Sequence, residues 1–170
     1  MRRFSKTPKV QGQDAILIQA PASMVWPMIR DSKTMESWGP PVEKVEVRLL
    51  PGQTLEGVGA ERTVHAKFSE KRKGWYEEVR TEQVEHTSIS FLITKDSFGM
   101  SKMLYDVGAK MELRPVSQEQ TEFVFTFYHR PKNVLGWLMN PMIKADQKKN
   151  RLKALDSIKS YIETGQAIKN

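Results

Sequence analysis

The chain has 170 residues, a usual length for one domain that buries its own core. It contains no cysteine, which excludes disulfides, thiolate metal ligands and cysteine nucleophiles. The net charge is +7, and the sequence has neither a signal-peptide pattern nor an apolar run long enough to span a membrane. We therefore expect a cytoplasmic protein whose basic residues form a solvated face, with an anionic membrane surface or anionic ligand as the alternative. A nucleic-acid partner is not expected, because no nucleic-acid-binding motif is present.

The first 41 residues predict an arm, one strand and two short helices. Residues 1–12 are polar and basic and contain Pro8 and Gly12, so we expect a flexible arm. Residues 14–20 form a short β-branched run that stops at Pro21, which predicts a strand. Residues 22–31 carry apolar side chains at helical spacing, and residues 32–38 predict a second short helix that ends at Gly39.

From residue 42 the apolar period becomes two, which predicts six further strands. They are expected at 42–49, 57–68, 75–84, 87–94, 102–113 and 121–129, and their short polar connections favour an antiparallel meander. The loop at 96–101 is expected to be flexible. Residues 133–164 return to helical spacing at Leu135, Leu138, Met139 and Met142 and again beyond Leu152. We expect Pro141 to kink or restart this helix and Gly165 to end it, with residues 166–170 as a tail.

This order of elements predicts a single α+β domain over residues 13–165. A curved antiparallel sheet of about seven strands must bury one face, and the C-terminal helix is the one long element that can cover it. Wrapping such a sheet around a helix leaves a space that is a natural ligand site. We expect its mouth between Trp38, the 96–101 loop and the C-terminal helix.

Three stretches carry a resemblance to a known family: residues 20–31 followed by Trp38-Gly39-Pro40, the glycine-rich strand opening at residues 57–62, and the closing helix at residues 138–163. They resemble the START/Bet v 1-like (SRPBCC) superfamily, which includes polyketide cyclases, dehydrases and lipid-transport proteins. The resemblance extends over residues 13–164. It implies a helix-grip fold, with the sheet and two short helices wrapped around the long C-terminal helix. It does not imply one activity, because the superfamily includes carriers, receptors, cyclases and protein activators.

Strand alternation directs one cation inward. Arg62 shares a face with Val64 and Ala66, so a charged side chain is expected among apolar ones. In the next strand Trp75, Glu77, Val79 and Thr81 share a face, and Glu77 is the expected partner of Arg62, because a buried charge is costly alone. Arg62 then has two roles open to it: a structural ion pair, or an anchor for a carboxylate or carbonyl group of a ligand.

The remaining inward faces supply a predicted cavity lining. Aromatic and aliphatic side chains at strand spacing form either plain core or ligand wall, and several methionines would make an adaptable wall (Met28, Met100, Met103, Met111, Met139 and Met142). The predicted ligand-cavity residues are Met28, Trp38, Arg62, Val79, Phe91, Ile93, Tyr105, Val107, Phe125, Phe127, Leu138 and Met142.

The groups available for catalysis are Arg62, Glu77, Tyr105 and His129. The three histidines lack metal-ligand spacing, and we expect no metal and no cofactor. The preferred function is a carrier or sensor that binds a lipid-, polyketide- or aromatic-like molecule. The alternatives are a cofactor-independent cyclase or dehydratase in the same cavity, and a protein-interaction or assembly factor that uses the basic arm and helix. The oligomeric state is not predicted.

Overall fold

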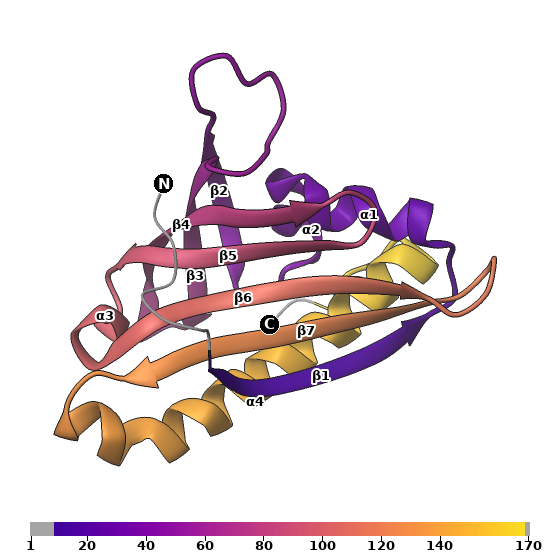
Figure 1. The fold of residues 1–170 in the computed structure, drawn as a ribbon. Helices are drawn as coiled ribbons and strands as arrows, with labels where there is room; N and C mark the ends of the chain where they lie inside the picture. Colours follow the sequence, from indigo (N-terminus) through magenta and orange to yellow (C-terminus); the bar gives the residue numbers. More distant parts are fainter. Residues whose placement is uncertain (1–8, 169–170) are drawn as a thin grey trace.

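Seven antiparallel strands form one curved sheet in the order β1-β7-β6-β5-β4-β3-β2 in the computed structural model, which describes residues 9–168 (Figure 1). The strands are β1 (Val10–Ile18), β2 (Val42–Arg48), β3 (Glu61–Ser69), β4 (Arg72–Val84), β5 (Ser88–Asp96), β6 (Leu104–Pro115) and β7 (Thr121–Pro131). Strands β2 to β7 pair in chain order as the predicted meander, and β1 adds to β7 at the far edge.

One long helix and several short ones complete the fold. They are α1 (Ala22–Arg30), the 3-10 turn η1 (Ser32–Thr34), α2 (Met35–Trp38), α3 (Met100–Met103) and α4 (Val134–Thr164). Helix α4 lies along the concave side of the sheet next to β1, and α1 and α2 lie at the end where α4 finishes (Figure 1). The predicted helix-grip fold is confirmed.

Several element boundaries differ from the predicted ones. Strand β1 begins at Val10, so residues 10–12 of the expected arm lie in the sheet, whereas residues 1–8 and 169–170 lie outside the described part. Strand β4 begins at Arg72, because the turn before it contains only two residues. The expected flexible loop at 96–101 ends in α3, since the Asp96 carboxylate accepts hydrogen bonds from the N–H groups of Met100 and Ser101.

The glycine-rich stretch expected to open β3 is instead a loop. Residues 49–60 project from the sheet between β2 and β3 (Figure 1), and β3 begins at Glu61. Gly59 has a φ of 90°, and a Cβ there would lie 2.6 Å from Leu50 Cδ1. A larger residue is therefore disfavoured both by the backbone conformation and by the close contact. The loop returns to the sheet through a hydrogen bond from Gly59 N to Arg80 O.

The core lies where α1, α2 and the second half of α4 meet the sheet. Trp38 and Trp26 are almost completely buried there, together with Phe91, Phe123 and Leu155. The Trp38 indole N–H donates to the Met28 carbonyl at 3.0 Å, and Ser157 Oγ donates to the Trp38 carbonyl at 2.7 Å. These bonds satisfy buried polar groups and join α1, α2 and α4 at this end.

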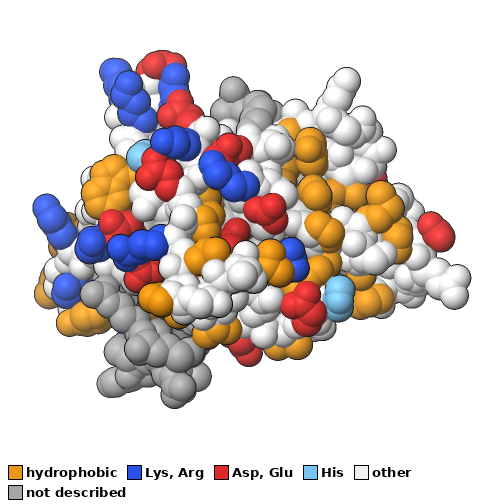
Figure 2. Space-filling model, turned by 90° about the horizontal axis from the view of Figure 1, so that it is seen from above, with side chains coloured by type: hydrophobic (Ala, Val, Ile, Leu, Met, Phe, Trp, Pro, Cys, Tyr) orange, Lys and Arg blue, Asp and Glu red, His pale blue; other side chains and the backbone are white. Residues whose placement is uncertain are grey.

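Charges on the outer side of the sheet are mostly paired with neighbours. Lys44 bonds Glu46 at 2.6 Å and Lys95 bonds Glu77 at 2.9 Å. Figure 2 shows one face of the molecule, on which acidic and basic side chains lie next to one another. Such interspersed charges do not create an extended positive field.

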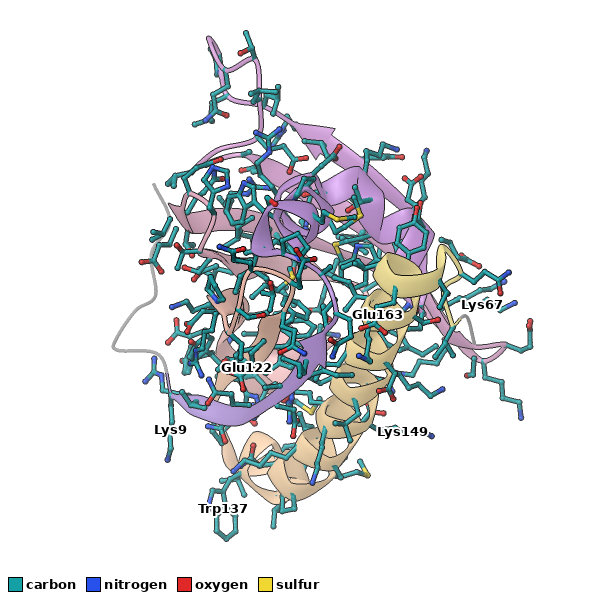
Figure 3. All side chains as sticks on the ribbon, turned by 90° about the vertical axis from the view of Figure 1, so that its right-hand side faces the viewer. Lys9, Lys67, Glu122, Trp137, Lys149 and Glu163 are labelled. Atoms are coloured by element: carbon teal, nitrogen blue, oxygen red, sulfur yellow. The ribbon has the colours of Figure 1, made fainter. Side chains whose placement is uncertain are left out.

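Helix α4 runs without interruption through Pro141, so the prediction of a restart there is wrong. Its two halves differ in burial. The second half buries Arg151, Leu155 and Ile158, whereas the first half buries only Gly136. The apolar side chains of the first half project outward, as Trp137 does in Figure 3. Among residues 9–168, no helix has both the length and the apolarity needed to cross a membrane.

Candidate functional site

An apolar pocket of about 420 Å³ opens between α3 and the first half of α4. Its lining residues are Arg72, Phe98, Met100, Met103, Leu104, Met139, Met142, Ile143, Asp146 and Gln147. Four of the methionines expected to form an adaptable wall therefore meet here. The pocket lies beside the 96–101 segment and α4, where the mouth of the cavity was expected, but Trp38 lies in the core and does not line it.

The two charged groups of the pocket bind each other. Arg72 Nη1 donates to Asp146 Oδ2 at 2.8 Å, across the gap between β4 and α4. The Arg72 guanidinium also lies 4.8 Å from the centre of the Phe68 ring, which meets Phe98 edge-on. The rest of the wall is apolar apart from Gln147, so the pocket offers dispersion and hydrophobic contact with few polar groups.

A buried ion pair lies on the concave face one helical turn beyond Gln147. Arg151 Nε donates to Asp14 Oδ2 at 2.6 Å, and the guanidinium lies 5.8 Å from the Phe127 ring. Phe127 in turn stacks on Phe125 with ring centres 5.0 Å apart. A Cβ on Gly12 would come within 2.7 Å of Arg151 Nη2, so a larger residue here would displace the guanidinium from its position. The pair joins α4 to the edge strand β1.

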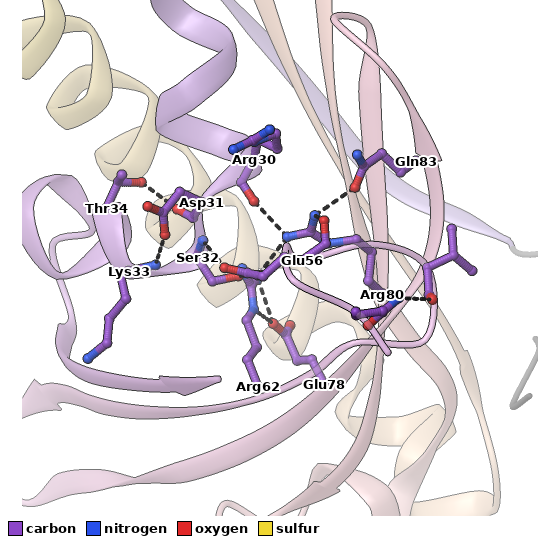
Figure 4. A network of polar contacts seen from close by, with 12 residues as sticks. Arg30, Asp31, Ser32, Lys33, Thr34, Glu56, Arg62, Glu78, Arg80 and Gln83 are labelled. Atoms are coloured by element: carbon purple, nitrogen blue, oxygen red, sulfur yellow. Dashed lines mark hydrogen bonds and ion pairs between the residues drawn. The ribbon is translucent and has the colours of Figure 1, made fainter. Parts of the chain in front are cut away.

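A second and larger polar network fills the opposite end of the concave face (Figure 4). Arg62 Nε donates to Glu78 Oε2 at 2.6 Å and Arg62 Nη1 donates to Ser32 Oγ at 3.1 Å. Ser32 Oγ donates to the Glu56 carboxylate, which also accepts from Arg80 Nη2 at 2.7 Å. The network therefore connects β3, β4, η1 and the 49–60 loop.

The charges of two guanidinium groups and two carboxylates cancel within this network. The Phe91 ring lies 3.6 Å from Arg62 Cζ and 5.4 Å from Arg80 Cζ, so the cations also contact a π face. Burial lowers the pKa of Arg80 to about 10, and the nearby Glu56 carboxylate opposes that shift. All three donor nitrogens of Arg62 point at partners within the protein. This geometry favours a structural ion pair, and ligand anchoring by Arg62 stays a prediction.

The predicted pair of Arg62 with Glu77 is wrong, because the partner is Glu78. In the β3–β4 register Arg62 stands opposite Glu78, and Glu77 stands opposite Thr63 on the outer side, where it binds Lys95. Val79, predicted to line the cavity, alternates with Glu78 and Arg80 and so belongs to the outer face as well. The inner face of β4 carries charges, whereas the prediction chose the more apolar face.

Tyr105 and Leu138 do not lie on the concave face either. Tyr105 is 46% exposed, because Asp106 adopts a φ of 52° and breaks the β6–β7 register next to it. The Tyr105 ring faces the Arg130 and Lys132 side chains and does not face a ligand cavity. Leu138 is 62% exposed on the outer side of α4, and Met142 is exposed but still contributes to the pocket wall.

His129 is completely buried at the end of β7 beneath α4. Its Nε2 bonds Asn140 Oδ1 at 2.8 Å, and Nδ1 has no partner among the described residues. Burial lowers the pKa of His129, the hydrogen bond with Asn140 opposes that shift, and the nearby Lys144 lowers the pKa further. Within residues 9–168 no hydrogen bond or ion pair joins any two of Arg62, Glu77, Tyr105 and His129.

The other predicted lining residues lie on or near the concave face. Trp38, Phe91 and Val107 are buried, whereas Met28, Ile93, Phe125 and Phe127 are partly buried. The closed end of this face is occupied by core side chains, so the open volume lies at the α3–α4 end. Among the described residues no group of three His, Asp or Glu side chains could hold a metal ion.

Several important side chains were not identified from the sequence. The inward direction of Arg80 could have been found from the sequence, because strand alternation places it on the same face of β4 as Glu78. No local sequence pattern indicates the roles of Glu56 and Asp14, since their ion-pair partners are 24 and 137 residues away. Phe98 was placed in a flexible loop, yet it forms part of the pocket wall.

Comparison with solved structures shows the same fold in proteins of low sequence identity. The Zhui aromatase/cyclase from Streptomyces sp. R1128 has a TM-score of 0.71 at 16% identity and covers 92% of this chain and 98% of its own. A START superfamily protein from Mycobacterium smegmatis has a TM-score of 0.70 at 11% identity, with 91% and 98% covered. Norcoclaurine synthase from Thalictrum flavum has a TM-score of 0.68 at 12% identity, with 96% and 91% covered.

The sequence itself matches one protein family. No curated protein sequence matches the chain. Residues 9–163, however, match the family described as polyketide cyclase / dehydrase and lipid transport, and that range includes all seven strands and all of α4 except Thr164. The chain therefore belongs to the polyketide cyclase / dehydrase and lipid transport family of the START/Bet v 1-like superfamily.

Proposed function

We propose that this protein binds a hydrophobic or amphipathic small molecule in the pocket between α3 and α4, as a carrier or sensor. The observation that carries the proposal is the pocket wall, in which four methionines, Phe98, Leu104 and Ile143 surround about 420 Å³. That volume is in the range of small-molecule sites, and methionine walls adapt to ligands of different shape. The chemistry of the ligand is lipid-, polyketide- or aromatic-like.

Two features of the proteins with the same fold support this ligand class. The norcoclaurine synthase structure contains dopamine and hydroxybenzaldehyde, both of which are aromatic, and the Zhui protein is an aromatase/cyclase. The polar groups near the pocket suit binding better than catalysis, because Arg72 and Asp146 neutralise each other and His129 is covered by α4. A cyclase or dehydratase reaction in the same pocket is the second candidate.

The proposal is tested by native mass spectrometry and organic extraction of the protein purified from its own host. We expect a stoichiometric apolar ligand. Replacing Met139→Gln keeps the length of a lining side chain but removes apolar surface, and we expect the affinity for that ligand to fall about five- to tenfold. Met24→Gln is the matched control, since Met24 is exposed on α1 at the other end of the molecule.

The outcomes separate the alternatives. Equal losses in the two variants, or an empty protein that shows no thermal shift with fatty acids or aromatic polyketides, would argue against the pocket as a ligand site. Recovery of the ligand in a chemically altered form after incubation would instead favour the cyclase or dehydratase. An empty protein that co-purifies with a stoichiometric protein partner would favour the assembly-factor alternative.

A further inference from the structure

The first three turns of α4 expose an unusual number of large apolar side chains. The apolar helix face consists of Val134, Leu135, Trp137, Leu138 and Met142, which are between 55% and 74% exposed. Single exposed apolar residues are ordinary, but five within nine positions of one helix are a contiguous patch that calls for a partner. Trp137 projects from the end of the helix in Figure 3.

The packing of this helix segment explains why the apolar side chains point outward. Gly136 is the buried position, and a Cβ there would lie 2.1 Å from the Met103 carbonyl oxygen, so the helix backbone rests directly on α3. Asn140 faces inward in the same way, toward His129. The contacts made by these two residues fix the rotation of the helix, and the apolar helix face is left on the opposite side.

Unpaired lysines adjoin the apolar helix face. Lys144, Lys148 and Lys149 follow it on the exposed side of α4, and Lys132 lies just before it. Lys102 lies on α3, where its carbonyl accepts a hydrogen bond from the N-cap residue of α4. Within residues 9–168 none of these five lysines forms an ion pair, unlike Lys44 and Lys95 on the outer side of the sheet. The one acidic residue between positions 131 and 155, Asp146, is bound to Arg72.

We propose that the apolar helix face and the adjoining lysines dock on the surface of an anionic lipid bilayer. Tryptophan and leucine side chains bury their apolar area at the boundary between headgroups and acyl chains, and lysines beside them are attracted to anionic headgroups. A second copy of the chain fits this surface poorly, because a symmetric contact brings the same unpaired lysines close together.

Docking in this way would also place the pocket at the bilayer. Met142 belongs both to the apolar helix face and to the pocket wall, and Met139 and Ile143 lie beside it on the pocket side. An amphipathic molecule could then pass between the bilayer and the pocket without crossing water. This last step rests on the proposed function, whereas the docking itself does not.

The docking is tested with the full chain and vesicles, without any pocket ligand. We expect the protein to co-sediment with vesicles that contain about 20% phosphatidylserine, and to bind more weakly to pure phosphatidylcholine or in about 0.5 M salt. The double variant Trp137→Gln/Leu138→Gln should lose at least about tenfold in vesicle affinity. Lys148→Gln/Lys149→Gln should lose about tenfold or more on the anionic vesicles alone.

The control is the double variant Leu55→Gln/Val116→Gln, which replaces two equally exposed apolar residues outside α4. Since all the substituted side chains are exposed, thermal unfolding should be unchanged in every variant. Absence of binding to anionic vesicles, or equal losses in the control, would overturn the proposal. A different result would also overturn it: the wild-type protein sediments as a dimer, and the Trp137→Gln/Leu138→Gln variant sediments as a monomer. The apolar helix face would then bind a second copy of the chain and not a bilayer. None of these results depends on whether the pocket holds a ligand.

Discussion

The two halves of α4 carry similar apolar patterns but are used in opposite ways. Leu155 and Ile158 in the second half are buried against the sheet, α1 and α2, whereas Leu135 and Leu138 in the first half are exposed. The second half is also fixed by Arg151 on Asp14 and by Ser157 on the Trp38 carbonyl. The first half is fixed mainly through Gly136 and Asn140, which are not apolar anchors.

The difference shows that apolar periodicity identifies a helix and its stripe, but not whether anything in the same chain covers the stripe. The second half lies over the core, where the sheet and two short helices supply that cover. The first half contacts α3 through its backbone, and its stripe is left for another surface. Buried and exposed apolar surface are therefore divided along one helix, and each half can be perturbed separately.

The largest expected effect comes from the ion-pair network at the closed end. Replacing Glu78→Ala leaves the buried Arg62 guanidinium without its carboxylate, which should lower the free energy of unfolding by about 3–5 kcal/mol. The neighbouring substitution Glu77→Ala removes only a partly exposed pair with Lys95 and should cost less than about 1 kcal/mol. Urea denaturation of the two variants measures this contrast, and similar losses would show that the inner face of β4 has been assigned wrongly.

The second prediction compares the two halves of α4 with the same substitution. Leu155→Ala removes a side chain that is 1% exposed, and the cavity left behind should lower the free energy of unfolding by about 2–5 kcal/mol. Leu138→Ala removes an exposed side chain and should change the free energy of unfolding by no more than about 0.5 kcal/mol. Thermal or urea unfolding of both variants is the measurement. A large loss for Leu138→Ala would mean that the first half is held by its apolar face after all.

The overall fold could be predicted from the sequence because its signals are local. Alternation of apolar residues predicted the strands, and the short polar connections predicted antiparallel pairing. The order of elements predicted that the C-terminal helix covers one face of the sheet. The inward direction of Arg62 also followed, since Val64 and Ala66 on the same face are apolar and buried. Of the six methionines predicted to form an adaptable wall, four line the pocket, whereas Met111 belongs to the core and Met28 packs against it.

The details of the polar site could not be predicted, because the alternation rule assigns the more apolar face to the interior. On β4 the interior face carries Glu78 and Arg80, whose burial is compensated by partners on other elements, among them Glu56 in a loop. Tyr105 was misplaced for a different reason. The positive φ of Asp106 shifts the register next to it. Aspartate tolerates that conformation better than most residues, but residue type alone does not locate a register shift within a strand.

The smallest expected effect concerns the point where β7 meets the first half of α4. His129 is buried, and burial lowers its pKa, so the unfolded chain binds a proton at a higher pH than the folded chain does. Stability should then be constant above the unfolded pKa and fall as the pH drops from about 7 toward 5. Carboxylates contribute little in that range, because their pKa values are lower.

Replacing His129→Gln should flatten this pH dependence, since glutamine does not titrate and can still bond Asn140. The control is His86→Asn, at an exposed turn position with a φ of 58° that asparagine tolerates, and it should keep the slope of the unmodified protein. Urea midpoints measured at several pH values give the comparison. If His129→Gln keeps the full slope, the imidazole is hydrated in the folded protein, and the first half of α4 covers β7 less tightly than the second half covers the core.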